Sequence, residues 1–108
     1  MVYPIKLDID RTFKYGMVAS DLIESKLKKP MVRIDVNSLT MKESAIFFWA
    51  GLAHEDNKLT PERVMQLADE YTNFADMSEL AGKAYVYGMT GKETIEEANA
   101  EVTADEKN

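Results

Sequence analysis

Two helix starts, each with its own capping residue, constrain the fold of this 108-residue chain more than any other feature. Thr40 and Glu43 form a capping box, in which the threonine oxygen accepts from the Glu43 N–H and the glutamate carboxylate reaches back. Thr60 caps the second start, and Pro61 occupies the first helical position, which tolerates its missing N–H. The predicted helices span residues 41–54 and 61–74, with a polar turn between them.

The N-terminal third carries the only strand signals. Residues 3–10 and 31–36 alternate apolar and polar side chains, which is the period of a half-buried strand. Two short strands are marginal alone, so they must pack against helices. The predicted fold class is α+β, mostly α: a small bundle of about four helices with a short two-stranded N-terminal β element.

Two further helices complete the predicted domain, which covers residues 1–90. One spans residues 17–28, and Pro30 prevents it from continuing. The other begins after a cap at Asp76 or Ser78 and ends at Gly91. The remaining segment, residues 91–108, is expected to hold a short helix over 94–100 and an acidic, disordered tail.

Composition and charge narrow the functional classes. The formal net charge is −6, and the segment from Gly91 onward, with six acidic and two basic residues, carries most of it. Such a chain gains little from binding nucleic acid. A DNA-reading helix-turn-helix is also disfavoured, because the second capped helix contains Asp69 and Glu70 and only one basic residue. The absence of cysteine, of a signal-peptide pattern and of a long apolar run leads us to expect a soluble intracellular protein.

No constellation of catalytic or metal-ligating residues stands out. His54 is the single histidine, and without cysteine a zinc site would need carboxylates gathered from elsewhere. We expect His54 to interact with the C-terminal end of the helix over 41–54. The five glycines do not form a phosphate-binding loop. The chain is therefore predicted to be no enzyme and to have no cofactor and no metal site.

The run Ile46-Phe47-Phe48-Trp49 is the anomaly of the first capped helix. At 100° per residue Phe48 and Trp49 fall on its core face, whereas Phe47 falls almost opposite. Phe47 is then either covered by the N-terminal strands or exposed to a partner. Tyr85 and Tyr87 cannot share one helix face, so one of them is expected at the surface.

Several short segments follow one another in a distinctive order: Tyr3-Pro4-Ile5, Leu7-Asp8, a helix ending at Ile23-Glu24, Trp49-Ala50-Gly51-Leu52, His54-Glu55-Asp56 and Leu59-Thr60-Pro61-Glu62. This order resembles the tail assembly chaperones of phages and prophages of Gram-positive bacteria. The similarity covers about the first seventy residues and is strongest between Gly51 and Val64. Its most specific part is the sequence Trp49-Ala-Gly-Leu, His54-Glu-Asp, Leu59-Thr-Pro-Glu. No residue of this pattern performs chemistry.

The resemblance implies a non-catalytic chaperone that binds the tape measure protein and the tail tube protein of the same phage, with self-association possible. It implies a location in the host bacterial cytoplasm and absence from the mature virion. A partner-binding surface is expected around Phe47, His54, Leu59 and Arg63. The alternative is another interaction module of a phage or its host, such as a head–tail connector or a small regulator.

Overall fold

The computed structural model describes residues 2–92 of the chain. The elements, in chain order, are β1 (Tyr3–Lys6), β2 (Asp10–Phe13), α1 (Met17–Leu27), the 3-10 turn η1 (Met31–Arg33), α2 (Met41–Leu52), α3 (Pro61–Tyr71) and α4 (Phe74–Thr90). Four helices and a two-stranded antiparallel sheet confirm the predicted fold class. The short helix and the tail predicted after Lys92 lie outside the described residues.

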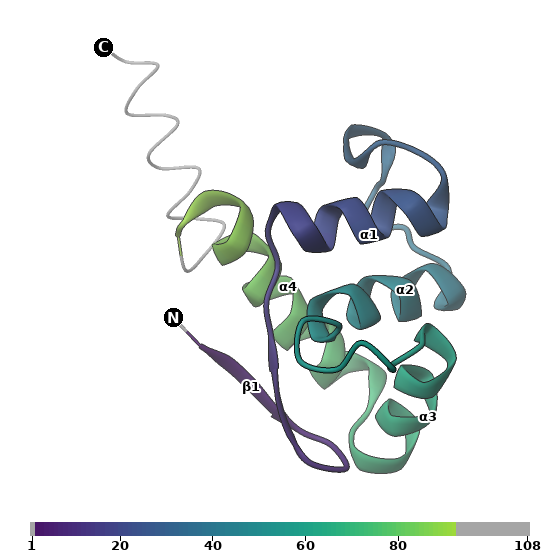
Figure 1. Cartoon of the computed structure of the whole chain (residues 1–108), viewed down its shortest axis with the longest axis vertical. Coiled ribbons are helices and arrows are strands. Elements are labelled where there is room, and N and C mark those ends of the chain that lie inside the picture. The colour runs from purple at the N-terminus through teal and green to yellow at the C-terminus, as the bar shows by residue number, and fades with distance from the viewer. Residues whose placement is uncertain (1, 93–108) are drawn as a thin grey trace.

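Helix α2 is the centre of the fold and packs against α1, α3, α4 and β2. In Figure 1, α1, α2 and α3 follow one another down the view, and α4 runs diagonally past them beside the hairpin. The predicted capping box starts α2, with the Thr40 Oγ1 accepting from the Glu43 N–H (3.1 Å) and the Glu43 carboxylate accepting from the Thr40 N–H (2.9 Å). A helix with neighbours on every side buries residues all round, so Phe47 is only 6% exposed. Phe47 is therefore covered and not exposed, but the rings that pack on it belong to Tyr15, which follows β2, and to Tyr85 of α4.

The two strands form a hairpin at the extreme N-terminus, with Tyr3 opposite Phe13 and Ile5 opposite Arg11. The prediction of one strand over residues 3–10 is wrong because the chain turns inside this range. The Leu7 N–H donates to the Ile9 carbonyl (3.0 Å), which reverses the chain between the strands. The alternation of apolar and polar residues therefore extends through the turn between the strands, and it cannot by itself show where β1 ends.

The second predicted strand, over residues 31–36, is also wrong. Its first part is η1, which follows Pro30 and is fixed when the Glu24 carboxylate accepts from the Met31 N–H (2.8 Å). Only Ile34 is buried, whereas Val32 is 92% exposed. Apolar alternation over six residues thus occurs here without a strand, because both strands of the described residues pair with each other and neither lies beside this segment.

Helix α4 begins earlier than predicted. Asn73 caps it by accepting from the Asp76 N–H (2.9 Å), so neither Asp76 nor Ser78 is the cap. Phe74, which the sequence placed at the end of the preceding helix, is consequently the first residue of α4. At the other end Gly91 adopts a left-handed conformation (φ 74°), which confirms the predicted break.

Tyr15, in the link between β2 and α1, is wedged between α2 and α4. Its hydroxyl donates to the Phe47 carbonyl (2.8 Å), and its ring stacks on that of Phe47 with the centroids 4.8 Å apart. Burial raises the pKa of the Tyr15 phenol, so the hydroxyl stays protonated and remains a donor. Two glycines make the room: a Cβ at Gly51 would lie 2.6 Å from the Tyr15 hydroxyl oxygen, and one at Gly88 would lie 2.6 Å from the Tyr15 carbonyl carbon.

The aromatic residues of α4 complete this packing. The Tyr85 ring lies 5.2 Å from that of Phe47, and the Tyr87 ring lies 6.0 Å from that of Tyr3. Both tyrosines are half-buried. The two tyrosines therefore face different neighbours, as expected: Tyr87 packs against the hairpin, and Tyr85 packs against Phe47 of α2.

We predict opposite effects for the same substitution at two glycines of α4. Gly88→Ala places a methyl group against the Tyr15 backbone and should lower the free energy of unfolding by about 1–3 kcal/mol. Gly82→Ala meets no atom within 4 Å and should raise it by about 0.5–1 kcal/mol, because alanine is the better helix former. Urea denaturation followed by circular dichroism measures both. Equal effects of the two substitutions would contradict the wedged placement of Tyr15.

Candidate functional site

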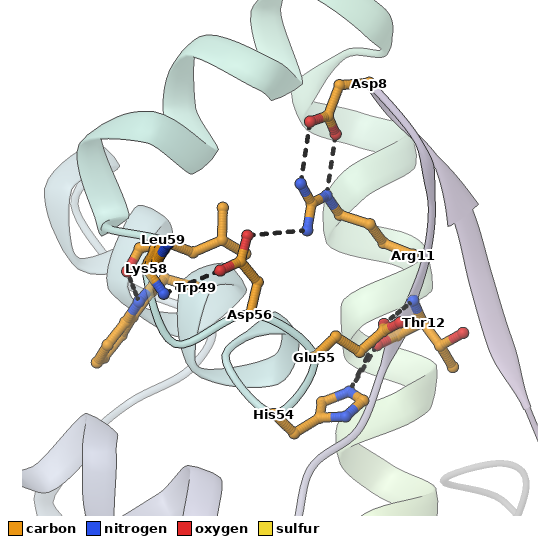
Figure 2. A network of polar contacts seen from close by, with 9 residues as sticks. All are labelled: Asp8, Arg11, Thr12, Trp49, His54, Glu55, Asp56, Lys58 and Leu59. Atoms are coloured by element: carbon orange, nitrogen blue, oxygen red, sulfur yellow. Dashed lines mark hydrogen bonds and ion pairs between the residues drawn. The ribbon is translucent and has the colours of Figure 1, made fainter.

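The turn after α2 holds the hairpin through two adjacent side chains. Figure 2 shows His54 and Glu55 pointing at Thr12 of β2. The Thr12 N–H donates to the Glu55 carboxylate, and the His54 Nε2–H donates to the Thr12 carbonyl oxygen (2.8 Å). A carbonyl can only accept, so this contact places the His54 hydrogen on Nε2. The two side chains satisfy both main-chain groups of Thr12, whose partner in the sheet register, Pro4, has no N–H to donate.

Asp56, the third residue of this turn, faces a buried guanidinium. The Arg11 side chain is 5% exposed, and its Nε and Nη2 donate to the two carboxylate oxygens of Asp8, each at 3.0 Å. Its Nη1 lies 3.9 Å from Asp56 Oδ2 (Figure 2). Hydrogen bonds from Arg11 lower the pKa of the Asp8 carboxyl. The Arg11 guanidinium therefore stabilises the β1–β2 turn through Asp8 and places it beside the turn between α2 and α3.

Trp49 fixes the far end of the same turn. Its Nε1–H donates to the Leu59 carbonyl (2.9 Å), and the Lys26 ammonium of α1 lies 5.5 Å from the centroid of its ring. Leu59 itself is 7% exposed. The segment that carries the family resemblance is thus a brace that joins the hairpin, α2 and the start of α3.

The four predicted partner-binding residues do not form one surface. Phe47 and Leu59 are buried, so the expectation of an exposed contact surface built on them is wrong. His54 lies beyond the last residue of α2 and binds β2, so its predicted interaction with the helix C-terminal end is replaced by one with Thr12. Arg63 is exposed in the first turn of α3 and contacts Gln66 (3.4 Å). Direct partner contact remains a prediction for His54 and Arg63, which are exposed, and for Phe47, which lines an apolar hollow.

An apolar hollow opens on another face of the molecule, between α2, α4 and the segment before α2. Its volume is about 780 Å³. Phe47, Phe48 and Tyr85 are among its lining aromatic residues. Its other lining residues are Val36, Asn37, Leu39, Met41, Ser44, Phe74, Ser78, Glu79, Gly82, Lys83 and Val86.

A second, smaller hollow of about 100 Å³ continues this surface toward α3. Met41, Ser44, Phe48 and Phe74 line both hollows. The smaller hollow is completed by Ala45, Met65, Ala68 and Asp69. Together the two hollows form one depression across α3, α2 and α4, which we call the apolar trough.

Large apolar side chains stand exposed along the trough. Met41 is 60% exposed and Phe74 is 48% exposed. The Phe74 ring lies 6.0 Å from the centroid of Phe48, so the exposed and the buried rings form one continuous surface. Contiguous exposed apolar surface of this kind marks sites of protein interaction. Methionine is suited to such sites because its unbranched side chain adapts to different partners.

Charge is sparse in the trough. Glu79 and Lys83 form an ion pair at 3.2 Å one turn apart on α4, which leaves Asp69 as the remaining ionised side chain of the lining. The arrangement can bury an apolar surface and offers few groups that would orient a polar ligand.

Sequence reasoning missed the trough because it assigned its residues to the core. Met41 and Phe48 share one face of α2. Phe48 is buried in the core, but Met41, in the first turn, lies beyond the edge of the core and is exposed. Phe74 was assigned to the wrong helix, and Val36 to a strand that does not exist. The available signal was the capping box itself, since a first-turn residue such as Met41 lies at the edge of the bundle.

The described residues contain no group of three or more acidic, histidine or cysteine side chains that could hold a metal ion. Within residues 2–92 no helix has the length and apolar character needed to cross a membrane. Comparisons of the chain with known protein families, curated proteins and solved structures find no match.

We predict that Asp8→Asn lowers the free energy of unfolding at pH 7 by about 1–3 kcal/mol, because it leaves the buried Arg11 guanidinium without its charged acceptor. The folded-state pKa of Asp8 lies below its ordinary value of 3.8. The stabilisation is therefore present above that value and is lost as the pH falls through the folded-state pKa. Urea denaturation at pH 7 and in acid should show that the difference in free energy of unfolding between the variant and wild type is smaller in acid. Asp10→Asn, an exposed neighbour in β2, is the matched control and should show little difference at either pH.

We also predict that truncation of Phe47 and truncation of Phe74, two aromatic residues of the trough lining, lower the free energy of unfolding by different amounts. Phe47→Ala should cost about 3–5 kcal/mol of folding free energy, because its ring is buried under Tyr15. Phe74→Ala should cost about 1 kcal/mol, because nearly half of its ring is already in water. Chemical denaturation distinguishes the two, and a Phe47→Ala variant as stable as wild type would contradict the burial of this residue.

Proposed function

We propose that the chain is a non-catalytic tail assembly chaperone of a phage or prophage, which binds the tape measure protein and the tail tube protein during tail morphogenesis. The observation that carries the proposal is the apolar trough. A tape measure protein is expected to be a long, apolar, helical polymer that aggregates before the tube forms around it. A chaperone for it needs an accessible apolar surface between helices, and the trough is of this kind.

The segment that resembles the chaperone family supports the proposal in a different way. The resemblance is strongest between Gly51 and Val64, where His54, Glu55 and Trp49 make the contacts that join the hairpin to the helices. None of these residues is among those that line the trough. They hold α2 and the start of α3 together, and these helices form the walls of the trough together with α4.

The acidic character of the chain suits such a role. The net charge of −6 keeps a protein with an exposed apolar surface soluble and repels non-specific partners. The proposal places the protein in the cytoplasm of the host bacterium and outside the mature virion. The tail tube protein would be recruited to the same complex.

The proposal predicts that the tape measure protein encoded in the same genome becomes soluble when it is co-expressed with this chain. The two proteins should co-purify by affinity and size-exclusion chromatography, because the trough shields apolar segments of the client. The soluble fraction of the client, with and without the chain, is the measurement. Gly88→Ala is a suitable control, because a loosened fold should lose client capture together with stability.

A tape measure protein that stays insoluble and does not co-purify would contradict the proposal. The alternative of a head–tail connector or a small regulator would then lead. Gene neighbourhood offers an independent check, since a gene for this kind of chaperone is expected between the tube and tape measure genes.

A further inference from the structure

No residue that the structure describes packs closely against the Cα of Gly82 in the way that Tyr15 packs against Gly51 and Gly88. Gly82 lies in the middle of α4 and lines the trough, and a Cβ built there would meet no atom within 4 Å. Gly51 and Gly88 differ, because a Cβ at either would collide with Tyr15. Glycine is disfavoured in a helix interior relative to alanine, so the fold alone gives no reason for glycine at position 82. A glycine with open space above it permits the close approach of another backbone.

Small and large side chains both surround Gly82 in the lining. Ser78 lies one turn before it on α4, and Ser44 is the buried serine of the α2 wall. Tyr85 lies one turn after it on α4, and the Phe47 and Phe48 rings of α2 are buried in the same lining. The apolar lining is therefore interrupted at Gly82, where the α4 wall carries no side chain.

The length of the trough suits a helix. Its α4 wall runs from Phe74 to Val86, which spans about 18 Å along the helix axis, or roughly three turns. A partner helix could place two or three apolar side chains, spaced three or four residues apart, along this length. The ion pair between Glu79 and Lys83 neutralises most of the lining charge, so the buried face of the partner has no need of a charged group.

We propose that the trough binds one amphipathic α-helix of the partner, whose backbone crosses α4 at Gly82 and whose apolar side chains fill the space between α2 and α4. This inference rests on the proposed function, and the tape measure protein is the partner that would supply the helix. Glu79 and Lys83 pair with each other, so Asp69 at the α3 end leaves the lining with a negative charge, which favours a helix with basic flanking residues.

Gly82→Leu in the full chain tests the inference. The new side chain would project into the open trough, so the urea midpoint should stay the same or rise. Capture of the tape measure protein, and of overlapping peptides that tile its sequence, should fall about tenfold or more, because the approach of the partner backbone is blocked. Ser25→Leu, on an exposed position of α1, adds the same side chain away from the trough and should bind like wild type.

A second probe does not depend on the client. A synthetic amphipathic helix with a leucine stripe and lysine flanks should bind the wild-type chain, and a peptide of the same composition in scrambled order should not. Gly82→Leu should abolish the difference between the two peptides, as measured by fluorescence anisotropy.

The outcomes separate the two proposals. If wild type captures the tape measure protein and Gly82→Leu captures it equally well, the function stands and the helix site is overturned. If wild type captures no client but binds the leucine-stripe peptide in a manner that Gly82→Leu abolishes, the helix site stands and the chaperone function fails. Equal binding of the ordered and scrambled peptides by wild type would show an unspecific apolar surface and would overturn the helix site.

Discussion

The wedge of Tyr15 between α2 and α4 is the constraint on which the rest of the structure depends. One side chain donates to the α2 backbone at Phe47, stacks on the Phe47 ring and fills the spaces that Gly51 and Gly88 leave open. These contacts set how far apart the two helices lie. Two walls of the apolar trough belong to the same pair of helices, so the width of the trough depends on the packing of Tyr15 between them.

The pattern that resembles the chaperone family lies in the brace and not in the trough. The polar residues of the α2–α3 turn bind Thr12 and face Arg11, and Trp49 binds the Leu59 carbonyl. A motif can thus suggest a family through the architecture that it stabilises, while the surface that would meet a partner is formed by ordinary apolar residues. Recognition of the motif and location of the site are separate problems in this chain.

Sequence reasoning identified the helices best where a local interaction defines their ends. The capping box at Thr40, the Thr60-Pro61 start and the break at Gly91 are fixed by contacts within a few residues, and all three are confirmed. The strands were misplaced because alternation alone does not reveal a turn at Leu7 or the absence of a partner strand near Ile34. The trough was missed because it depends on which helix faces remain uncovered, and this is decided by contacts such as that of Tyr15 with Phe47, 32 residues apart.

The position of Gly88 has a consequence for the order in which the chain can assemble during synthesis. The hairpin leaves the ribosome before the helices, and the carboxylate that binds Thr12 follows 43 residues later. The second wall of the Tyr15 slot follows later still, with the last turns of α4. The hairpin can therefore make its contacts with the helices only after these residues have been synthesised, and the trough forms only after α4 has packed against α2. The trough is complete only when nearly all of the described residues have been translated.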